Sequence, residues 1–127
     1  MLKDRNSSAI VAVSDIDRAR AFYEDTLGLT RAGEGQEGDV LSFRTGDTTL
    51  TVYRSGFAGT NKANAVTWDM KGDLVETVEA LKSRGVVFEH YPDMGMTLNG
   101  DIHEAGAMKL VWFKDPDGNI LHLIDGM

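Results

Sequence analysis

The chain has 127 residues, of which 42% are hydrophobic and 26% are charged, an ordinary balance for one globular domain. Its 13 Lys and Arg side chains stand against 20 Asp and Glu, and the net charge of -7 argues against nucleic acid or an anionic membrane as a partner. The absence of cysteine excludes disulfides, zinc–thiolate sites and a cysteine nucleophile, and is compatible with the cytoplasm. No apolar stretch reaches the roughly 18 residues that a membrane-spanning helix needs.

The first half of the chain has the pattern of one helix flanked by strands. Ser8–Val13 alternates as a strand, and helical apolar spacing then runs to Gly28, which supplies the left-handed residue that ends a helix. Ser14 and Asp15 are candidate caps for the start of this helix. Ser14 also stands three residues before Asp17, in a capping-box arrangement. Three further strands are predicted over residues 30–33, 39–44 and 48–54.

The second half repeats this order. Asn64–Met70 is a predicted strand, and Asp73 is the expected cap of a helix that ends at Gly85. The stretch Pro92–Gly106 lacks a clean period, so we expect a long loop that closes over an apolar ligand through Met94 and its neighbours. The pattern is therefore β-α-β-β-β, stated twice within one domain over residues 1–127. Strands are expected over 86–91, 107–113 and 119–125, the first unit covers about 7–56, and the second covers about 63–126.

Three segments carry a resemblance to a known family: Ala21–Leu29 with the residues before it, the connecting loop Ser55–Asn61 that leads into Trp68, and the closing segment Trp112–Leu121. They resemble the vicinal oxygen chelate superfamily, which includes glyoxalase I, bleomycin-resistance proteins, fosfomycin-modifying enzymes and extradiol dioxygenases. The resemblance implies an α+β fold in which two tandem βαβββ units form a curved, cup-like mixed β-sheet with helices packed outside. Because this scaffold hosts many chemistries, the resemblance implies a fold more than an activity.

The resemblance also implies four positions from which metal ligands project into the cup. In this sequence they hold Ser8, Ala65, one of Thr49, Thr51 and Tyr53, and His122. Hydroxyl groups bind divalent transition metals poorly and Ala cannot bind them, whereas zinc, iron or manganese needs about three strong protein ligands. We therefore expect no metal and no other cofactor. The alternative left open is a shifted metal site that uses His103, Glu104, His90 or Glu89.

His122 is the first candidate for contact with a ligand. Strand alternation directs it into the cup, where a neutral imidazole can accept a hydrogen bond or act as a base near pH 7. Glu89 and Tyr91 share one face of a strand, and in an apolar cup the Glu89 carboxylate would have a raised pKa and could move a proton. A buried structural role for His122 and a solvated rim position for Glu89 remain the alternatives. The candidate catalytic residues are His122 and Glu89, and the candidate ligand-binding residues are Ser8, Thr51, Tyr53, Phe57, Ala65, Tyr91, Met94, His103 and His122.

These residues leave more than one function open, and whether the chain is an enzyme is undecided. The first hypothesis is a metal-free, cytoplasmic protein that binds a small organic molecule in the cup, in the manner of bleomycin-resistance proteins. The second is a lyase or isomerase in which His122 acts with Glu89 or Tyr53 as acid and base. A metal-dependent glyoxalase or dioxygenase and a regulatory domain with a vestigial cup are further alternatives. We expect a homodimer, although spacing encodes neither the ligand nor the mode of dimerisation.

Overall fold

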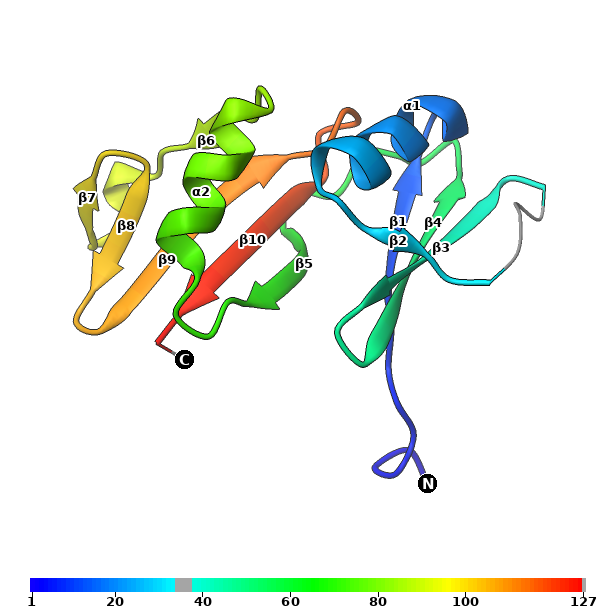
Figure 1. Cartoon of the computed structure of the whole chain (residues 1–127), viewed down its shortest axis with the longest axis horizontal. Coiled ribbons are helices and arrows are strands. Elements are labelled where there is room, and N and C mark those ends of the chain that lie inside the picture. Colours follow the sequence, from blue (N-terminus) through cyan, green and yellow to red (C-terminus); the bar gives the residue numbers. More distant parts are fainter. Residues whose placement is uncertain (34–37, 127) are drawn as a thin grey trace.

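The computed structural model describes residues 1–33 and 38–126 and has an α+β fold with two mixed β-sheets, as Figure 1 shows. In the first sheet the strand order is β1-β4-β3-β2, with β1 parallel to β4 and the other pairs antiparallel. Helix α1 continues directly into a π-helical segment, η1, and both pack against one face of this sheet. The elements are β1 (Ala9–Val13), α1 (Ile16–Arg20), η1 (Ala21–Thr26), β2 (Thr30–Arg31), β3 (Val40–Thr45) and β4 (Thr48–Arg54).

The second sheet has the order β5-β10-β9-β8-β7, and the short strand β6 pairs with the end of β9. Helix α2 covers one of its faces (Figure 1). Within the described residues, no helix is long and apolar enough to cross a membrane. The elements are β5 (Asn64–Asp69), α2 (Leu74–Ser83), β6 (Phe88–Glu89), the 3-10 turn η2 (Pro92–Met94), β7 (Thr97–Asn99), β8 (Ile102–Ala105), β9 (Met108–Lys114) and β10 (Ile120–Asp125).

The order of helices and strands agrees with the sequence analysis, with one difference in the second half. The stretch Pro92–Gly106, expected to be a loop, contains η2 and the β7–β8 hairpin, in which Leu98 pairs with His103. These strands have three and four residues, too few to show a clear alternation. The expected strand over 86–91 is also shorter, because only β6 pairs with β9, and that over 30–33 is reduced to β2.

The start of α1 differs from the predicted capping box. Asp15 is the cap, and its Oδ1 accepts hydrogen bonds from the backbone N–H groups of Asp17 and Arg18, both at 3.0 Å. The Ser14 hydroxyl donates instead to the Asp117 carboxylate, which lies in the turn between β9 and β10. A distant partner has thus replaced the local contact that the sequence spacing predicted.

The start of α2 departs further from the expectation. Asp73 stands at the cap position, but its side chain makes no capping hydrogen bond. The carboxylate of Asp125, at the end of β10, accepts the N–H groups of Gly72 at 2.7 Å and Leu74 at 3.0 Å. The α2 cap therefore comes from a strand 51 residues further along the chain than Leu74.

The main hydrophobic core lies between the helices and the two sheets, where Tyr23, Phe43 and Phe113 are at most 1% exposed. Trp68 packs against the edge of this core and stays partly exposed. A smaller apolar cluster around Trp112 forms on the opposite face of the second sheet, together with Leu110 and Ile124. The second sheet is therefore apolar on both faces.

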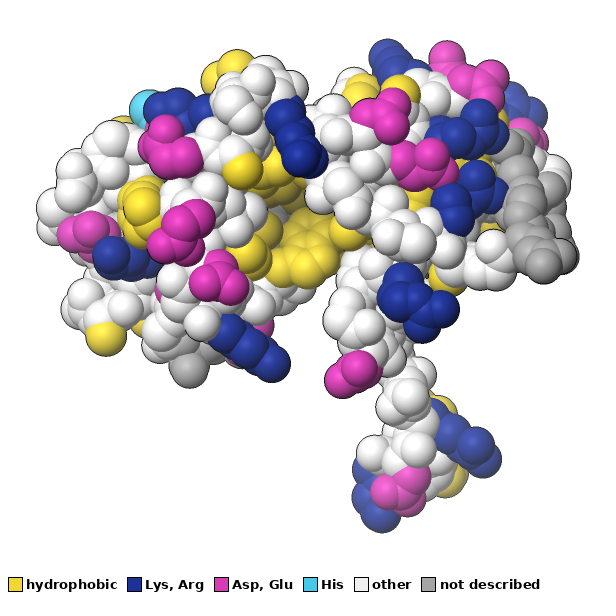
Figure 2. Space-filling model, viewed as in Figure 1, with side chains coloured by type: hydrophobic (Ala, Val, Ile, Leu, Met, Phe, Trp, Pro, Cys, Tyr) yellow, Lys and Arg dark blue, Asp and Glu magenta, His cyan; other side chains and the backbone are white. Residues whose placement is uncertain are grey.

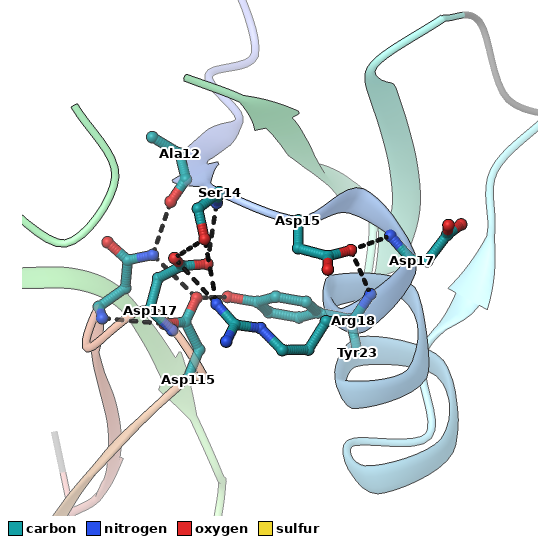
Figure 3. Close-up of polar contacts among 9 residues, drawn as sticks. Ala12, Ser14, Asp15, Asp17, Arg18, Tyr23, Asp115 and Asp117 are labelled. Atoms are coloured by element: carbon teal, nitrogen blue, oxygen red, sulfur yellow. Dashed lines mark hydrogen bonds and ion pairs between the residues drawn. The ribbon is translucent and has the colours of Figure 1, made fainter. Parts of the chain in front are cut away.

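A hydrogen-bonded network joins the two sheets at the turn between β9 and β10, as Figure 3 shows in part. Asp115 is 4% exposed and accepts the Tyr23 hydroxyl at 2.8 Å and the Asn119 side-chain N–H at 2.8 Å. Asn119 also donates to the Ala12 carbonyl of β1 at 2.8 Å. Burial raises the pKa of Tyr23 and the nearby Asp115 carboxylate raises it further, so the phenol keeps the proton that it donates.

Asp117 extends this network toward α1. Its carboxylate pairs with the Arg18 guanidinium at 3.1 Å and accepts the Ser14 backbone N–H at 3.0 Å. The connecting loop packs onto the same turn at Gly59, where φ is +75° and an added Cβ would lie 2.3 Å from the Asp117 carbonyl oxygen. We call Ser14, Arg18, Tyr23, Asp115, Asp117 and Asn119 the inter-sheet network.

Replacing Tyr23 by Phe removes only the hydroxyl that reaches Asp115. We expect Tyr23→Phe to lower the free energy of unfolding by about 1.5–3 kcal/mol, the usual range for a hydrogen bond to a charged group. The control is Tyr53→Phe, since Tyr53 is half-buried and the described residues give its hydroxyl no hydrogen bond. Urea unfolding followed by circular dichroism checks this, and equal losses in both variants would contradict the assigned role.

Asp125 and Asp73 provide a second matched pair. Asp125→Ala removes the acceptor for two amides at the start of α2, so we expect a loss of about 0.5–2 kcal/mol in the free energy of unfolding. Asp73→Ala should change this free energy by less than about 0.5 kcal/mol, because its side chain makes no capping bond. The same unfolding measurement applies, and a larger loss for Asp73→Ala would show that the local cap dominates in solution.

Candidate functional site

Side chains on the second sheet alternate between α2 and the opposite face, which we call the cup face. On β10, Leu121 and Leu123 belong to the core under α2, while His122 points to the cup face. On β9, Phe113 lies under α2 and Trp112 lies on the cup face beside His122, its partner in the strand register. The predicted orientation of His122 is therefore confirmed.

Two adjoining cavities of about 370 and 240 Å³ open on the cup face, and both contact Asn64 at the start of β5. The larger cavity has His122 in its wall and the smaller has Trp112. The larger cavity is lined by Asn64, Ala65, Val66, Thr67, His122 and Ile124, and the smaller by Lys62, Asn64, Tyr91, Met94, Trp112 and Ile120.

His122 is 6% exposed and is held in one tautomer by the backbone of β9. Its Nδ1 lies 3.0 Å from the Val111 carbonyl oxygen, which can only accept, so Nδ1 carries the proton and donates. Nε2 then has a free lone pair, because no described residue forms a hydrogen bond with it, and it is not among the fully buried polar atoms. Burial lowers the pKa of His122 against the opposing effect of the Val111 carbonyl, so the ring is neutral at pH 7. A neutral hydrogen-bond acceptor is thus available in the cavity wall.

Aromatic rings surround this histidine. The Trp112 ring stacks on His122 with centroids 4.6 Å apart and an interplanar angle of 17°. Tyr91 meets Trp112 edge-on at 5.4 Å. The Trp112 indole N–H donates to the Asn64 side-chain oxygen at 3.1 Å, which leaves the amide N–H groups of Asn64 free to donate. The site therefore combines an aromatic wall with an imidazole acceptor, His122, an amide donor, Asn64, and the hydroxyl of Thr67.

His103, proposed as a ligand contact, is fully buried behind this wall. Its Nε2 accepts the Tyr91 backbone N–H at 2.9 Å, and its ring packs edge-on against Trp112 with centroids 4.9 Å apart. Burial lowers the pKa of His103, with an opposing effect from the Leu110 backbone. Among the described residues, no group lies in good hydrogen-bonding geometry to Nδ1 of His103. In the single chain, His103 supports Tyr91 and Trp112 from behind.

Glu89 lies at the edge of the sheet and does not border the His122 cavity. It faces Trp112 in the register of β6 with β9, but its carboxylate pairs with Lys114 at 3.1 Å and lines a different cavity. His90, considered for a shifted metal site, is bonded to Asp101 at 2.8 Å on the surface. The chain therefore places the two candidate catalytic residues, His122 and Glu89, in separate surroundings.

The remaining predicted contacts divide between the two sheets. Ala65, Tyr91 and Met94 line the cup-face cavities with His122. Ser8, bonded to the Thr49 hydroxyl at 3.0 Å, lies with Thr51 and Tyr53 on the face of the first sheet that points away from α1. This open face also carries the exposed Ile10 and Val40, and Phe57 of the connecting loop is 80% exposed.

Several cavity residues were not among the predicted ligand contacts, and two of them, Lys62 and Asn64, bring a charge and an amide to the lining. Both lie where the connecting loop joins β5, and nothing in their spacing marks them as site residues. The hydrogen bond from Trp112 to Asn64 joins residues 48 positions apart, so no local pattern could have indicated it. Lys62 brings the one charged side chain to the cavity lining.

The residues around His122 do not fit the metal that the family resemblance suggests. The larger cavity offers hydroxyl, amide and aliphatic side chains beside the single imidazole. Across the residues that the structure describes, three or more His, Asp or Glu side chains do not gather at one point. A divalent transition metal needs a stronger donor set than this.

Comparisons with known proteins place the fold. The model of the Glyoxalase/Bleomycin resistance protein/Dioxygenase superfamily matches residues 7–123, and no curated protein sequence matches. Lactoylglutathione lyase from Agrobacterium tumefaciens is 17% identical with a TM-score of 0.73, over 99% of this chain and 96% of that chain. A genomically encoded fosfomycin resistance protein from Listeria monocytogenes is 14% identical with a TM-score of 0.72, over 100% and 96%. A protein from the mobile metagenome of V. Pseudocholerae is 22% identical with a TM-score of 0.69, over 100% and 98%.

The two buried histidines predict how stability depends on pH. Burial lowers the pKa of His103 and His122 below the value of about 6.5 that each regains in the unfolded chain. Below that pH the unfolded chain binds more protons than the folded one, so the free energy of unfolding is highest above pH 6.5 and falls as the pH drops. Urea unfolding between pH 7.5 and 5 should show this decline. Histidine ring signals in NMR spectra give the direct check, and a pKa above 6.5 for either ring would contradict it.

Proposed function

Because the chain belongs to the Glyoxalase/Bleomycin resistance protein/Dioxygenase superfamily, we propose that it is a cytoplasmic protein that binds a small organic molecule on the cup face without a metal. The observation that carries this proposal is the geometry of His122. Its Nδ1 donates a hydrogen bond to the Val111 carbonyl, and this leaves Nε2 as an acceptor in a cavity whose lining has no carboxylate. Such a site binds through a hydrogen bond and apolar contact.

The cavity lining indicates the chemistry of the ligand. A hydroxyl or N–H group of the ligand donates to His122 Nε2, and its apolar or planar body lies against Ile124 and the aromatic wall. Lys62, in the lining of the smaller cavity, favours an acidic group on the ligand. The best-fitting class is therefore a planar, neutral or acidic molecule that carries a hydrogen-bond donor.

We further propose that the protein acts as a homodimer. Its accessible surface of 7867 Å² exceeds by roughly 1,200 Å² the area typical of a monomer of its mass. A second copy that covered the open face of the first sheet would bury the exposed side chains of Ile10 and Val40. The same contact would bring Thr51 and Tyr53 of one protomer toward a cup face of the other.

A second candidate function is a lyase or isomerase, and the same atom favours it. A neutral imidazole with a free Nε2 is suited to act as a general base near pH 7. Glu89 is held by Lys114, so the acid would be Tyr53 supplied by the second copy. Conversion of a bound ligand, lost in a variant without His122, would favour this function over simple binding.

The test is a screen of small phenols, aromatic acids and amides at pH 7.5 in the presence of EDTA, read by NMR. We expect hits to shift the Trp112 indole N–H signal. His122→Phe should weaken hits that carry a hydrogen-bond donor at least tenfold, which corresponds to about 1.4 kcal/mol. His90→Phe is the control, because His90 bonds to Asp101 at the surface. Unchanged affinity in His122→Phe, or binding only after zinc is added, would overturn the proposal.

A further inference from the structure

A separate cavity of about 150 Å³ lies on the helix side of the second sheet, between the two halves of the molecule. Figure 2, viewed from this side, shows apolar side chains gathered in a hollow there. Its floor is formed by Phe113 and Leu123, which are 1% and 4% exposed. We call it the helix-side pocket, and its lining residues are Leu27, Leu29, Trp68, Met70, Thr77, Leu81, Phe113 and Leu123.

The lining of the helix-side pocket has two polar side-chain groups, the Thr77 hydroxyl and the Trp68 indole N–H, and the indole N–H is not among the fully buried polar atoms, so water can satisfy it. Its one hydroxyl, that of Thr77, donates to the Asp73 carbonyl within α2 at 2.8 Å. None of the eight lining residues is charged. A bound water molecule needs two to four polar partners, so this pocket favours an apolar occupant over water.

We propose that the helix-side pocket is a second binding site, for an uncharged apolar small molecule the size of one six-membered ring. The cavity volume indicates the size of the ligand, because an apolar cavity of about 150 Å³ accommodates benzene. The lining indicates the chemistry, because a charge, or a hydroxyl that faces the floor of Phe113 and Leu123, would be buried without a partner.

This site is distinct from the one on the cup face, although the two share three strands. Trp68, Leu123 and Phe113 line the helix-side pocket. Their chain neighbours Thr67, His122 and Trp112 line the cavities on the other face. The sites therefore lie back to back across one sheet, and the chain's two tryptophans report on them separately.

The pocket also bridges the two halves of the chain. Leu27 and Leu29 follow η1 of the first half, whereas Thr77 and Leu81 belong to α2 of the second half. A molecule that fills the pocket contacts both halves and binds only when they are docked. Binding therefore raises the thermal midpoint of unfolding as ligand concentration rises.

The test uses toluene as the probe and phenol, with the same number of heavy atoms, as its polar counterpart. We expect toluene to shift the Trp68 indole and Met70 methyl NMR signals saturably, to leave the Trp112 indole unshifted, and to raise the thermal midpoint. Phenol should bind this pocket at least tenfold more weakly. No saturable shift up to the solubility limit of toluene, or a shift at Trp112 alone, would overturn the proposal.

Thr77→Leu fills the pocket with a good helix former and should abolish toluene binding while leaving the fold intact. Glu79→Leu introduces the same residue on the exposed side of α2 and should leave binding unchanged. Undiminished binding in Thr77→Leu would overturn the proposal. If the NMR signals of Trp68 changed with protein concentration alone, the proposal would also be overturned, since a side chain of a second copy would then be the occupant.

Because binding at the cup face is monitored through the Trp112 signal, a negative result at one site does not affect the test of the other.

Discussion

The buried carboxylate of Asp115 is the constraint on which the arrangement of the two sheets depends. A buried charge is costly unless hydrogen bonds surround it, and Asp115 finds its partners on both sides of the molecule. Tyr23 reaches it from η1, and Asn119 links it to the Ala12 carbonyl of β1. The turn between β9 and β10 is thereby held against the first half, and this fixes where the second sheet presents each of its faces.

The second sheet then supports two different kinds of site through simple alternation. On β10, His122 and Leu123 are adjacent in the chain, yet His122 borders a cavity with an acceptor and an amide, whereas Leu123 borders a largely apolar pocket. The Val111 carbonyl contributes to this division because it holds the His122 proton on Nδ1. One register of β9 with β10 therefore sets the tautomer, the stacking of Trp112 and the chemistry of both faces.

Local signals predicted the features that depend on neighbouring residues. Gly28 and Gly85 end their helices with φ values of 73° and 90°, as their positions after an apolar helical face indicated. The alternation of side chains along β10, which is also a local pattern, correctly predicted that His122 faces away from α2. Apart from the short β7–β8 hairpin, the contacts that sequence reasoning missed are long-range: Asp125 caps α2, Lys114 binds Glu89, and Asn64 holds Trp112. No pattern within a short window contains both partners of such a contact.

The capping of α2 by Asp125 also has a consequence for biosynthesis. As the chain leaves the ribosome, α2 emerges well before β10, so the amides of Gly72 and Leu74 must at first be satisfied by water. Asp115, the anchor between the two sheets, emerges almost as late. Although the chain repeats a similar unit, the contacts that join its two halves and cap α2 can form only after the strands that follow α2 have been translated.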